Sequence, residues 1–545
     1  MTDDSRDSAL APVSRFMAAA FGRHSGLEGK GVDELRTLVA ALTTALLEGH
    51  ICIELSERQR QLAARSLLTA VGSRAPLVLS GTRLYFGRYF GYESELSEML
   101  VNLAAADDSS ADREFKEKSR ATMDMDPHQQ RAVNLALTKK FCIISGGPGT
   151  GKTTLIISII SQLLDRHGTD LRIALAAPTG KAALRMQESI KTQLHELTLE
   201  PALAARFPAQ ATTLHRLLGL GRRPGRTTSQ RSDPLVHDVV VVDEASMVDL
   251  AMMWRLSHAL KKDARLILLG DRDQLASVES GAVLADCIDS LPNNVARLKK
   301  SYRFNRSIAR LAEKIKTGAA DEAWKSVTGS DNSAVAVAPA DWLNACIAEY
   351  RHFLSLAEET ADPIHYDAVF KRFKRFRVLC ALRKGPSGAE EINLRIEQAL
   401  KTMKIRTDAE GWYSGKPVLI TSNDYDLDLF NGDIGICLPD SASDGVLRLW
   451  FEGSDGSFKK ILPSQVPLHE PGWALTIHKS QGSEFEEVVV VLPEIDNRVL
   501  CRELLYTAVT RARARLSLVA QEDIFKSSVE KKTLRHSGLA DRLAG

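Results

Sequence analysis

A glycine-rich segment that ends in a lysine and a threonine is the first feature of this sequence that could do chemistry. Residues 146–153 read GGPGTGKT, with the apolar run FCIIS before them and TTLIISIISQLL after them. Between a strand and a helix, such glycines let backbone N–H groups surround phosphate oxygens, while the lysine meets the β- and γ-phosphates and the hydroxyl holds Mg²⁺. We therefore predict a nucleoside triphosphate site formed by Gly146, Gly147, Pro148, Gly149, Thr150, Gly151, Lys152, Thr153 and Thr154.

Two adjacent carboxylates could complete a hydrolytic site. The stretch VVVVDEAS, residues 239–246, ends an apolar run with Asp243 and Glu244. Phosphoryl transfer depends on positioning and on neutralising charge, so Asp243 would hold Mg²⁺ and Glu244 would orient and deprotonate the attacking water. Acidic residues often follow strands, and it is the preceding phosphate-binding motif that favours this interpretation.

Three further side chains could act on the γ-phosphate, and each has a plainer interpretation. Gln274 follows the run LILLGD, where its amide could sense the γ-phosphate or simply be a polar loop residue. A cleft between two lobes needs positive charge from its far side, and Arg303 and Arg511 are candidates. Taken alone, each arginine is more often a surface residue in a weak ion pair.

The elements that must position these residues follow from the hydrophobic pattern. Residues 1–110 show mostly helical spacing of apolar residues, and the polar stretch 111–124 is typical of a linker. From residue 125, apolar runs alternate with helical patterns, which predicts an α/β fold with parallel sheets covered on both faces. The pattern predicts two tandem lobes, 125–300 and 301–545, with a small antiparallel β insertion at about 432–468 in the second.

The composition limits the classes of function. The 545 residues are 44% hydrophobic with a formal net charge of +2, so any path for nucleic acid must be local. Seven scattered cysteines without a Cys-x-x-Cys pair favour reduced thiols in the cytoplasm over disulfides or zinc. The N-terminus does not resemble a signal peptide, and no apolar run approaches the 18 residues of a membrane span.

Taken in the order in which they occur along the chain, the motifs of this sequence resemble those of superfamily 1 helicases. The matching stretches are MDPHQQRAV, the phosphate-binding motif, APTGKAAL, TTLHRLLG, VVDEASMVD, GDRDQLASVESGAVL, LKKSYRF, LTIHKSQGSEF and YTAVTRAR. The stretches GDRDQLASVE, NDYDLDLFNGDIGI and HKSQGSEF are similar to those of the RecD family, the alpha subunits of bacterial RecBCD (exonuclease V) complexes. EGHICIELS and GTRLYFGRYFGYE resemble the partner-binding domain of that family.

The resemblance implies an ATP-dependent DNA helicase and single-strand translocase with two RecA-like lobes. Its cofactors would be ATP and Mg²⁺, its direction 5′ to 3′, and its partners RecB-like and RecC-like subunits in double-strand-break repair and recombination. The exonuclease site would lie in a partner, because the sequence offers no convincing nuclease constellation of its own. A 5′-to-3′ direction does not follow from spacing or charge.

The resemblance also assigns residues. Gln129 would read adenine, Glu484 would contact the ribose, and Gln274, Arg303 and Arg511 would act in catalysis. Hydroxyls, backbone amides and a few lysines suit a phosphate backbone read without base preference. The residues expected to contact single-stranded DNA are Pro178, Thr179, Gly180, Lys181, Thr213, His215, Thr476, His478, Lys479, Ser480 and Gln481.

Two basic segments each allow two structural interpretations. Residues 221–237 would form a small strand-separating pin, or the sequence GRRPGRTTSQR within them is a flexible basic loop. The stretch KRFKRFR, 371–377, interleaves basic and aromatic residues as a nucleic-acid groove does, but we favour a solvated lead-in to the next strand.

The sequence leaves two rival functions. One is a standalone RecD-like helicase, but those carry a longer N-terminal region than the roughly 120 residues that precede Gln129 here. The other is a DNA-binding scaffold in which the nucleotide only switches conformation. A complete hydrolytic set argues against the scaffold, since a pure switch does not need one.

Overall fold

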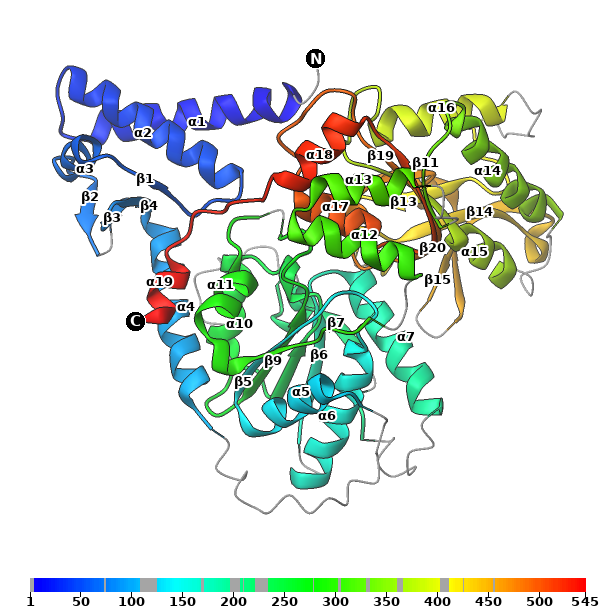
Figure 1. Cartoon of the computed structure of the whole chain (residues 1–545), viewed down its shortest axis with the longest axis horizontal. Helices are drawn as coiled ribbons and strands as arrows, with labels where there is room; N and C mark the ends of the chain where they lie inside the picture. Colours follow the sequence, from blue (N-terminus) through cyan, green and yellow to red (C-terminus); the bar gives the residue numbers. More distant parts are fainter. Residues whose placement is uncertain are drawn as a thin grey trace.

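The computed structural model describes residues 4–72, 75–107, 125–167, 171–196, 206–208, 210–220, 234–277, 279–301, 305–329, 334–359, 366–401, 411–424, 426–453 and 456–545. Within these ranges the chain forms four sheets: one in an N-terminal domain, one in each of two lobes, and one in an insertion in the second lobe (Figure 1). The linker expected at 111–124 lies outside the described residues, as do residues 221–233 of the expected pin. No described helix is long and apolar enough to cross a membrane.

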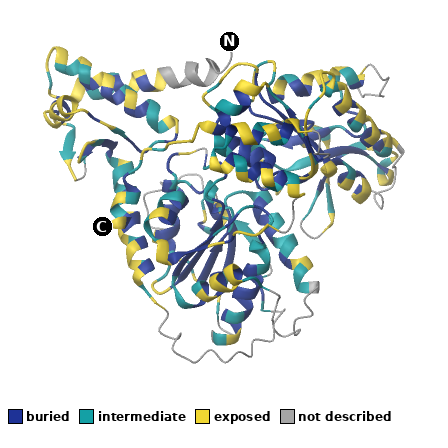
Figure 2. Ribbon diagram, in the orientation of Figure 1, coloured by how far each residue is buried: buried dark blue, intermediate teal, exposed yellow. Residues whose placement is uncertain are grey.

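The first lobe is built on a parallel six-stranded sheet in the order β10-β5-β9-β8-β6-β7. Its strands are β5 Phe141–Ser145, β6 Ile173–Ala177, β7 Ala211–Thr213, β8 Val239–Val242, β9 Arg265–Gly270 and β10 Val295–Arg297. Its helices are α5 Pro127–Thr138, α6 Lys152–His167, α7 Gly180–Glu196, α9 Leu214–Leu217, α10 Leu250–Ala259 and α11 Val283–Ser290. Alternate residues of β5 enter two different cores, Phe141 and Ile143 in one and Cys142 and Ile144 in the other. Burial on both faces explains the uninterrupted apolar runs and confirms the predicted parallel sheet (Figure 2).

The second lobe repeats this architecture with the parallel order β11-β20-β19-β12-β18. Its strands are β11 Val335–Val337, β12 Phe376–Cys380, β18 Ala474–Thr476, β19 Phe485–Val491 and β20 Ala512–Val519. Its helices are α12 Arg306–Thr317, α13 Ala320–Thr328, α14 Trp342–Glu359, α15 Tyr366–Arg375, α16 Ala389–Lys401, α17 Arg502–Val509 and α18 Glu522–Glu530. The two lobes face each other, so the loops at their strand ends can form a shared site (Figure 1).

The antiparallel insertion is larger than the sequence indicated. Its sheet has the order β16-β15-β14-β13-β17, formed by β13 Pro417–Ile420, β14 Ile434–Asp440, β15 Val446–Glu452, β16 Phe458–Ile461 and β17 His469–Pro471. From its apolar run alone, KPVLITSND is assigned to the parallel sheet of the lobe; that assignment is wrong, because the stretch forms β13 and pairs antiparallel with β14 and β17. Val418 and Ile420 enter the core of the insertion while Leu419 enters that of the lobe. Burial on both faces gives β13 the apolar run of a parallel strand.

The N-terminal domain combines helices with a sheet of short strands. Its helices are α1 Asp4–His24, α2 Lys30–Leu47, α3 Glu57–Ala64 and α4 Gly87–Ala105, and its sheet has the order β1-β4-β3-β2. The strands are β1 Cys52–Glu54, β2 Thr69–Val71, β3 Leu77–Ser80 and β4 Arg83–Phe86. α4 leaves this domain and packs along α10 of the first lobe.

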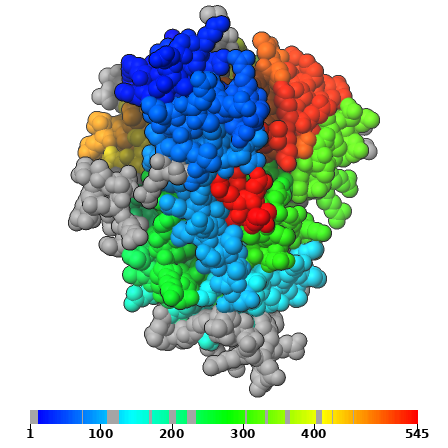
Figure 3. Space-filling view, turned by 90° about the vertical axis from the view of Figure 1, so that its left-hand side faces the viewer, coloured from blue at the N-terminus to red at the C-terminus, as the bar shows by residue number. Residues whose placement is uncertain are grey.

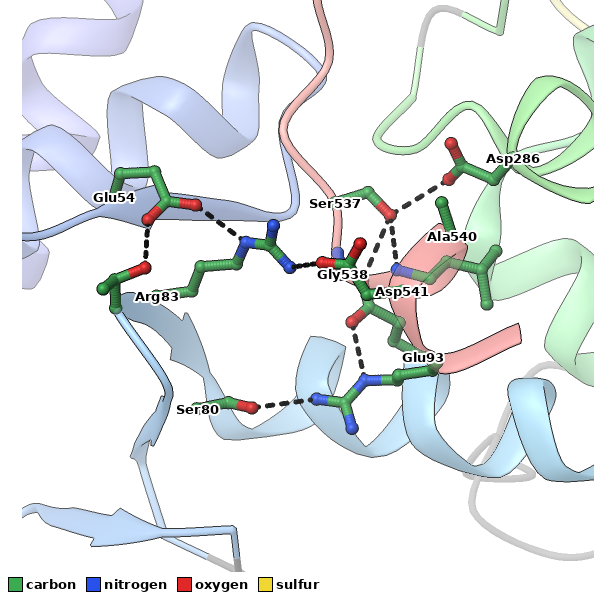
Figure 4. A network of polar contacts seen from close by, with 12 residues as sticks. Glu54, Ser80, Arg83, Glu93, Asp286, Ser537, Gly538, Ala540 and Asp541 are labelled. Carbon is green, nitrogen blue, oxygen red and sulfur yellow. Dashed lines mark hydrogen bonds and ion pairs between the residues drawn. The ribbon is translucent and has the colours of Figure 1, made fainter. Parts of the chain in front are cut away.

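The segment 531–545, which we call the C-terminal strap, joins the second lobe to both other parts of the molecule. It leaves α18, passes the N-terminal domain and ends in α19 Leu539–Ala544, which packs between α4 and α11 (Figures 1 and 3). The side chain of Glu93, which has no exposed surface, accepts hydrogen bonds from the Gly538 amide at 2.9 Å and from Arg542 Nε at 3.0 Å (Figure 4). Arg535 donates to the carbonyls of Ser277, Glu279 and Gly281 in the first lobe.

Candidate nucleotide site at the lobe interface

A cleft between the two lobes contains most of the residues expected to bind and cleave a nucleotide. It holds about 690 Å³ of space between atoms, part of it open to solvent. The first lobe contributes Pro148, Gly149, Gly151, Lys152, Thr153, Thr154, Ala182, Arg185, Met186, Ser189, Gln193, Asp243, Glu244 and Gln274, and the second contributes Gly482, Glu484 and Arg511.

The phosphate-binding loop lies between β5 and α6, as its sequence predicts. Lys152 is the first residue of α6, and its Nζ donates to the carbonyls of Gly146 at 2.7 Å and Gly147 at 3.3 Å. Gly151 has a φ of 85°, and a Cβ there would lie 2.7 Å from Gln129 Nε2. The lysine thus lies over the loop at the start of a helix, the arrangement that binds phosphate groups.

The two carboxylates after β8 point to a metal-assisted hydrolysis. Burial and the neighbouring Glu244 raise the pKa of Asp243 to about 6, against the opposing charge of Lys152. The Glu244 amide donates to Asp243 Oδ1 at 2.9 Å, and Glu244 itself has a φ of 51°, in the left-handed region. A non-glycine residue in that conformation stores strain, which is frequent at functional sites.

The residues present fit a nucleotide-bound Mg²⁺ rather than a metal held by protein alone. Among the described residues, no group of three or more His, Cys, Asp or Glu side chains could hold a metal ion. Mg²⁺ in nucleotide sites is bound by one or two protein ligands together with phosphates and water. Thr153 and Asp243 both line the cleft and could supply those ligands.

Arg511 brings positive charge to the cleft from the second lobe. It is 1% exposed, and it donates from Nε to the Thr507 carbonyl at 3.1 Å and from Nη1 to the Ser483 carbonyl at 2.9 Å. Its buried Nη2 has no hydrogen-bond partner among the described residues. A buried guanidinium with one unused donor beside a phosphate-binding loop fits an anionic ligand.

Gln274 and Glu484 also line the cleft, from opposite lobes. Gln274 is 4% exposed and its Nε2 donates to Asp271 Oδ2 at 3.3 Å. Glu484 is held by two arginines, with Oε1 2.5 Å from Arg185 Nη2 and Oε2 2.7 Å from Arg513 Nη2. The carboxylate predicted to contact ribose is therefore engaged in ion pairs.

Four predicted nucleotide contacts, Gly146, Gly147, Thr150 and Gln129, do not line this cleft. Gln129 accepts from the Asp126 amide in the capping box of α5 and donates from Nε2 to the Thr150 carbonyl at 3.2 Å, so it supports the phosphate-binding loop from behind. Arg303 lies outside the described residues.

The residues expected to contact DNA gather where the two lobes meet. Pro178–Lys181 follow β6, and Thr213 ends the neighbouring β7, in register with Ala177. A Cβ on Gly482, which follows the stretch Thr476–Gln481, would lie 3.5 Å from the Cβ of Ala182. Burial and the charge of Arg377 lower the pKa of Lys181 to about 7, opposed by Asp433 in the insertion.

The expected DNA residues differ in how far they are accessible. His215 is exposed, and Thr476, His478 and Lys479 are half-buried. Ser480 and Gln481 are buried, and their side chains donate to the carbonyls of Ile477 at 2.7 Å and Leu275 at 3.0 Å. These last two side chains shape the loop from inside.

Comparisons with known proteins agree with this geometry. Residues 129–280 match the family model described as AAA domain, and residues 471–519 match the UvrD-like helicase C-terminal domain. The RecBCD enzyme subunit RecD of Mycolicibacterium smegmatis is 37% identical, with 93% of each chain covered. That of Haemophilus influenzae is 35% identical over 87% of this chain and 82% of its own. The chain belongs to the RecD family.

The chain also has more distant matches among curated proteins and solved structures. The ATP-dependent RecD2 DNA helicase of Deinococcus radiodurans is 28% identical over 85% of this chain and 58% of its own length. A solved Pif1 helicase from Bacteroides, in complex with ADP-AlF3 and ssDNA, has 18% identity and a TM-score of 0.42 over 76% of this chain and 95% of that one. A TM-score this low does not establish the fold, which rests on the two parallel sheets described above.

Sequence reasoning missed Arg185, Asp271 and Tyr506. Arg185 lines the cleft, and the buried side chains of Asp271 and Tyr506 are hydrogen-bonded to each other. A signal for Arg185 existed, since Ala182, Arg185, Ser189 and Gln193 recur at the spacing of one helix face and all line the cleft. Asp271 and Tyr506 come together only through tertiary structure.

The basic and aromatic stretch 371–377 leads into β12, as we favoured, but it is solvated only in part: Lys371, Lys374 and Arg375 are exposed, while its aromatic residues are buried. It closes α15 and opens β12, where Phe373 and Phe376 are buried. Arg377 has no exposed surface and lies 3.9 Å over the Phe373 ring. The aromatic residues build the core of the second lobe, while Arg375 on the other face pairs with Glu486 and Glu487.

Proposed function

We propose that this chain is an ATP-driven motor that moves along single-stranded DNA and separates duplex, as the RecD subunit of a RecBCD-type complex. ATP and Mg²⁺ are the cofactors, held by Lys152, Thr153 and Asp243. Separating duplex costs about 1.4 kcal/mol per base-pair step in stacking, and hydrolysis supplies that free energy.

One observation carries the proposal. A single cleft brings the phosphate-binding loop and the acidic pair of the first lobe together with Arg511 and Glu484 of the second. Hydrolysis that needs groups from both lobes is coupled to their relative position, and the loops expected to contact DNA lie at the same boundary.

The chemistry of the cleft follows from these groups. Glu244 would orient and deprotonate the attacking water, while Lys152 and Arg511 neutralise the charge that develops on the transferred phosphoryl group. Bound Mg²⁺ would neutralise further phosphate charge. Gln274, which lines the cleft from the first lobe, would sense the γ-phosphate.

The direction 5′ to 3′ and the RecB-like and RecC-like partners are part of the proposal. Their support is membership of the RecD family, whose relatives are named as subunits of the RecBCD enzyme. The N-terminal domain, residues 1–110, would bind the partners, and the exonuclease site would lie in one of them. Lower identity to the RecD2 helicase makes a standalone helicase the second candidate.

The experiment is ATP-dependent unwinding by the purified chain of two duplexes, one with a 5′ single-stranded tail and one with a 3′ tail. Unwinding from the 5′ tail alone is expected of a RecD-type motor, and unwinding from the 3′ tail alone contradicts the proposed direction. Lys152→Gln is the matched negative control. A wild-type chain without single-strand-stimulated hydrolysis would instead favour the scaffold function.

Co-purification distinguishes the subunit from the standalone helicase. Expressed with the two large partners of its own genome, the chain should be recovered in a complex that contains both. A chain that unwinds alone and is never recovered with partners would favour the standalone helicase.

A further inference from the structure

Arg185 connects the two lobes at the edge of the nucleotide cleft. It lies on α7 of the first lobe, and its guanidinium donates from Nη1 to the Gly482 carbonyl at 3.3 Å and pairs through Nη2 with Glu484 at 2.5 Å. Both partners belong to the second lobe. Burial lowers the pKa of Arg185, but Glu484, Glu244 and Asp243 more than offset this and hold it above its ordinary value. Arg185 therefore remains a cation between acidic groups of both lobes.

The segment Gly482–Glu484 is held by three arginines from different directions. Arg185 holds it at Gly482 and Glu484 from the first lobe, and Arg511 holds the Ser483 carbonyl from behind. Arg513, on β20 of the second lobe, pairs with the other oxygen of Glu484. Among these three arginines, only Arg185 contacts the segment from the other lobe.

This segment directly follows the loop expected to contact DNA. The loop residues 476–481 lead without a break into Gly482, which has a φ of 72° and approaches Ala182 at the start of α7. The positive φ of Gly482 disfavours a side chain, and a Cβ there would be in van der Waals contact with Ala182 of the first lobe. A shift of α7 against the second lobe would move this segment and the loop with it.

We propose that Arg185 is the positioning residue that couples nucleotide binding in the cleft to the DNA-contacting loop, by holding Gly482 and Glu484 to the first lobe. The inference rests on the proposed function. It assigns to a first-lobe residue a role in transmission between the two sites, distinct from the chemistry performed by Lys152, Glu244 and Arg511.

Coupling between two sites is measurable as a ratio of affinities, and it is reciprocal. The test measures the Kd of the full chain for a fluorescent single-stranded oligonucleotide, with and without a non-hydrolysable ATP analogue. In the wild-type chain the analogue should change this Kd at least about fivefold, the usual lower bound for allosteric coupling. In Arg185→Gln the ratio should fall to within about twofold of unity.

Arg513→Gln is the matched control. It removes an arginine from the same carboxylate, but one that belongs to the same lobe as Glu484, and it should keep the wild-type ratio. Arg185→Lys keeps the charge but loses the fork of donors, and should give an intermediate ratio. In Arg185→Gln, Glu484 keeps its pair with Arg513, so the fold should persist, and a thermal melt checks this.

The outcomes separate the inference from the proposed function. A wild-type ratio in Arg185→Gln, or an equal loss of coupling in Arg513→Gln, overturns the inference alone. A wild-type chain that binds single strands and hydrolyses ATP with no coupling also overturns it. Absence of single-strand binding in the wild-type chain overturns the proposed function and, with it, the inference.

Discussion

The hydroxyl of Tyr506 in the second lobe donates a 2.9 Å hydrogen bond to Oδ2 of Asp271 in the first. Both residues are buried, at the start of the segment that carries Gln274 and on helix α17. The same carboxylate oxygen accepts from Gln274 Nε2 at 3.3 Å. Gln274, which lines the nucleotide cleft, is thus connected through the Asp271 carboxylate to Tyr506 on α17 of the opposite lobe.

Tyr506→Phe should uncouple this connection. The change removes one of the donors to the buried Asp271 carboxylate, and hydrogen bonds to charged groups contribute about 1.5–3 kcal/mol. We expect the kcat of single-strand-stimulated ATP hydrolysis to fall about tenfold, because Gln274 is no longer fixed. Tyr350→Phe is the control, since it removes a hydroxyl that bonds to the Trp473 carbonyl within one lobe at 2.5 Å. Equal losses of kcat in both variants would contradict the role of Tyr506.

Gly147→Ala should push the lobes apart. A Cβ at this position would lie 2.9 Å from the Tyr506 hydroxyl oxygen. The clash should lower the free energy of unfolding by about 1–3 kcal/mol, as measured in urea. Adding Tyr506→Phe removes the clashing atom, so Gly147→Ala should cost less in that background. Strictly additive effects would show that the two positions do not interact.

The sequence predicted the elements and most of the first-lobe residues that line the cleft, because both depend on local pattern. The residues of the phosphate-binding loop and the Asp243–Glu244 pair are adjacent in the chain, and apolar runs mark the strands that carry them. It could not predict Arg185 or the Tyr506–Asp271 bond, because these depend on how two lobes meet. The strand β13 was misassigned since burial on both faces produces the same apolar run in either kind of sheet.

Asp243→Asn should stabilise the protein in the absence of nucleotide and Mg²⁺. The folded pKa of Asp243, about 6, is above its unfolded value of 3.8, so the folded state binds more protons between these pH values. The free energy of unfolding therefore falls as pH rises from about 4 to about 6. Above about pH 6 the carboxylate is ionised, and its burial destabilises the folded state by the full amount. We expect the free energy of unfolding of the variant to exceed that of the wild type by on the order of 3 kcal/mol at about pH 8, and to differ little from it near pH 4.

The same substitution should abolish ATP hydrolysis, because the amide cannot replace a carboxylate on Mg²⁺. Denaturant unfolding across this pH range checks the first effect, and steady-state ATPase rates check the second. A variant less stable than the wild type at about pH 8 would contradict the assigned electrostatic cost of Asp243.

Arg542→Ala should loosen the C-terminal strap. Glu93 has no exposed side-chain surface, and loss of its cation leaves a buried charge that costs about 3–5 kcal/mol. Arg498→Ala is the control, because it breaks the Arg498–Glu48 pair, whose side chains are 43% and 37% exposed, for which about 0–1 kcal/mol is expected. Limited proteolysis should cut the N-terminal domain faster in Arg542→Ala than in Arg498→Ala, and equal rates would contradict the strap contact.

The strap also has a consequence for the order in which this chain matures on the ribosome. Residues that form the sheet and helices of the N-terminal domain emerge before both lobes, yet α19, which packs between α4 and α11, emerges after them. At about 5–20 residues per second, the nascent domain waits on the order of half a minute or more for α19. During that interval the surface of α4 that α19 later covers is open to chaperones and to other newly made chains.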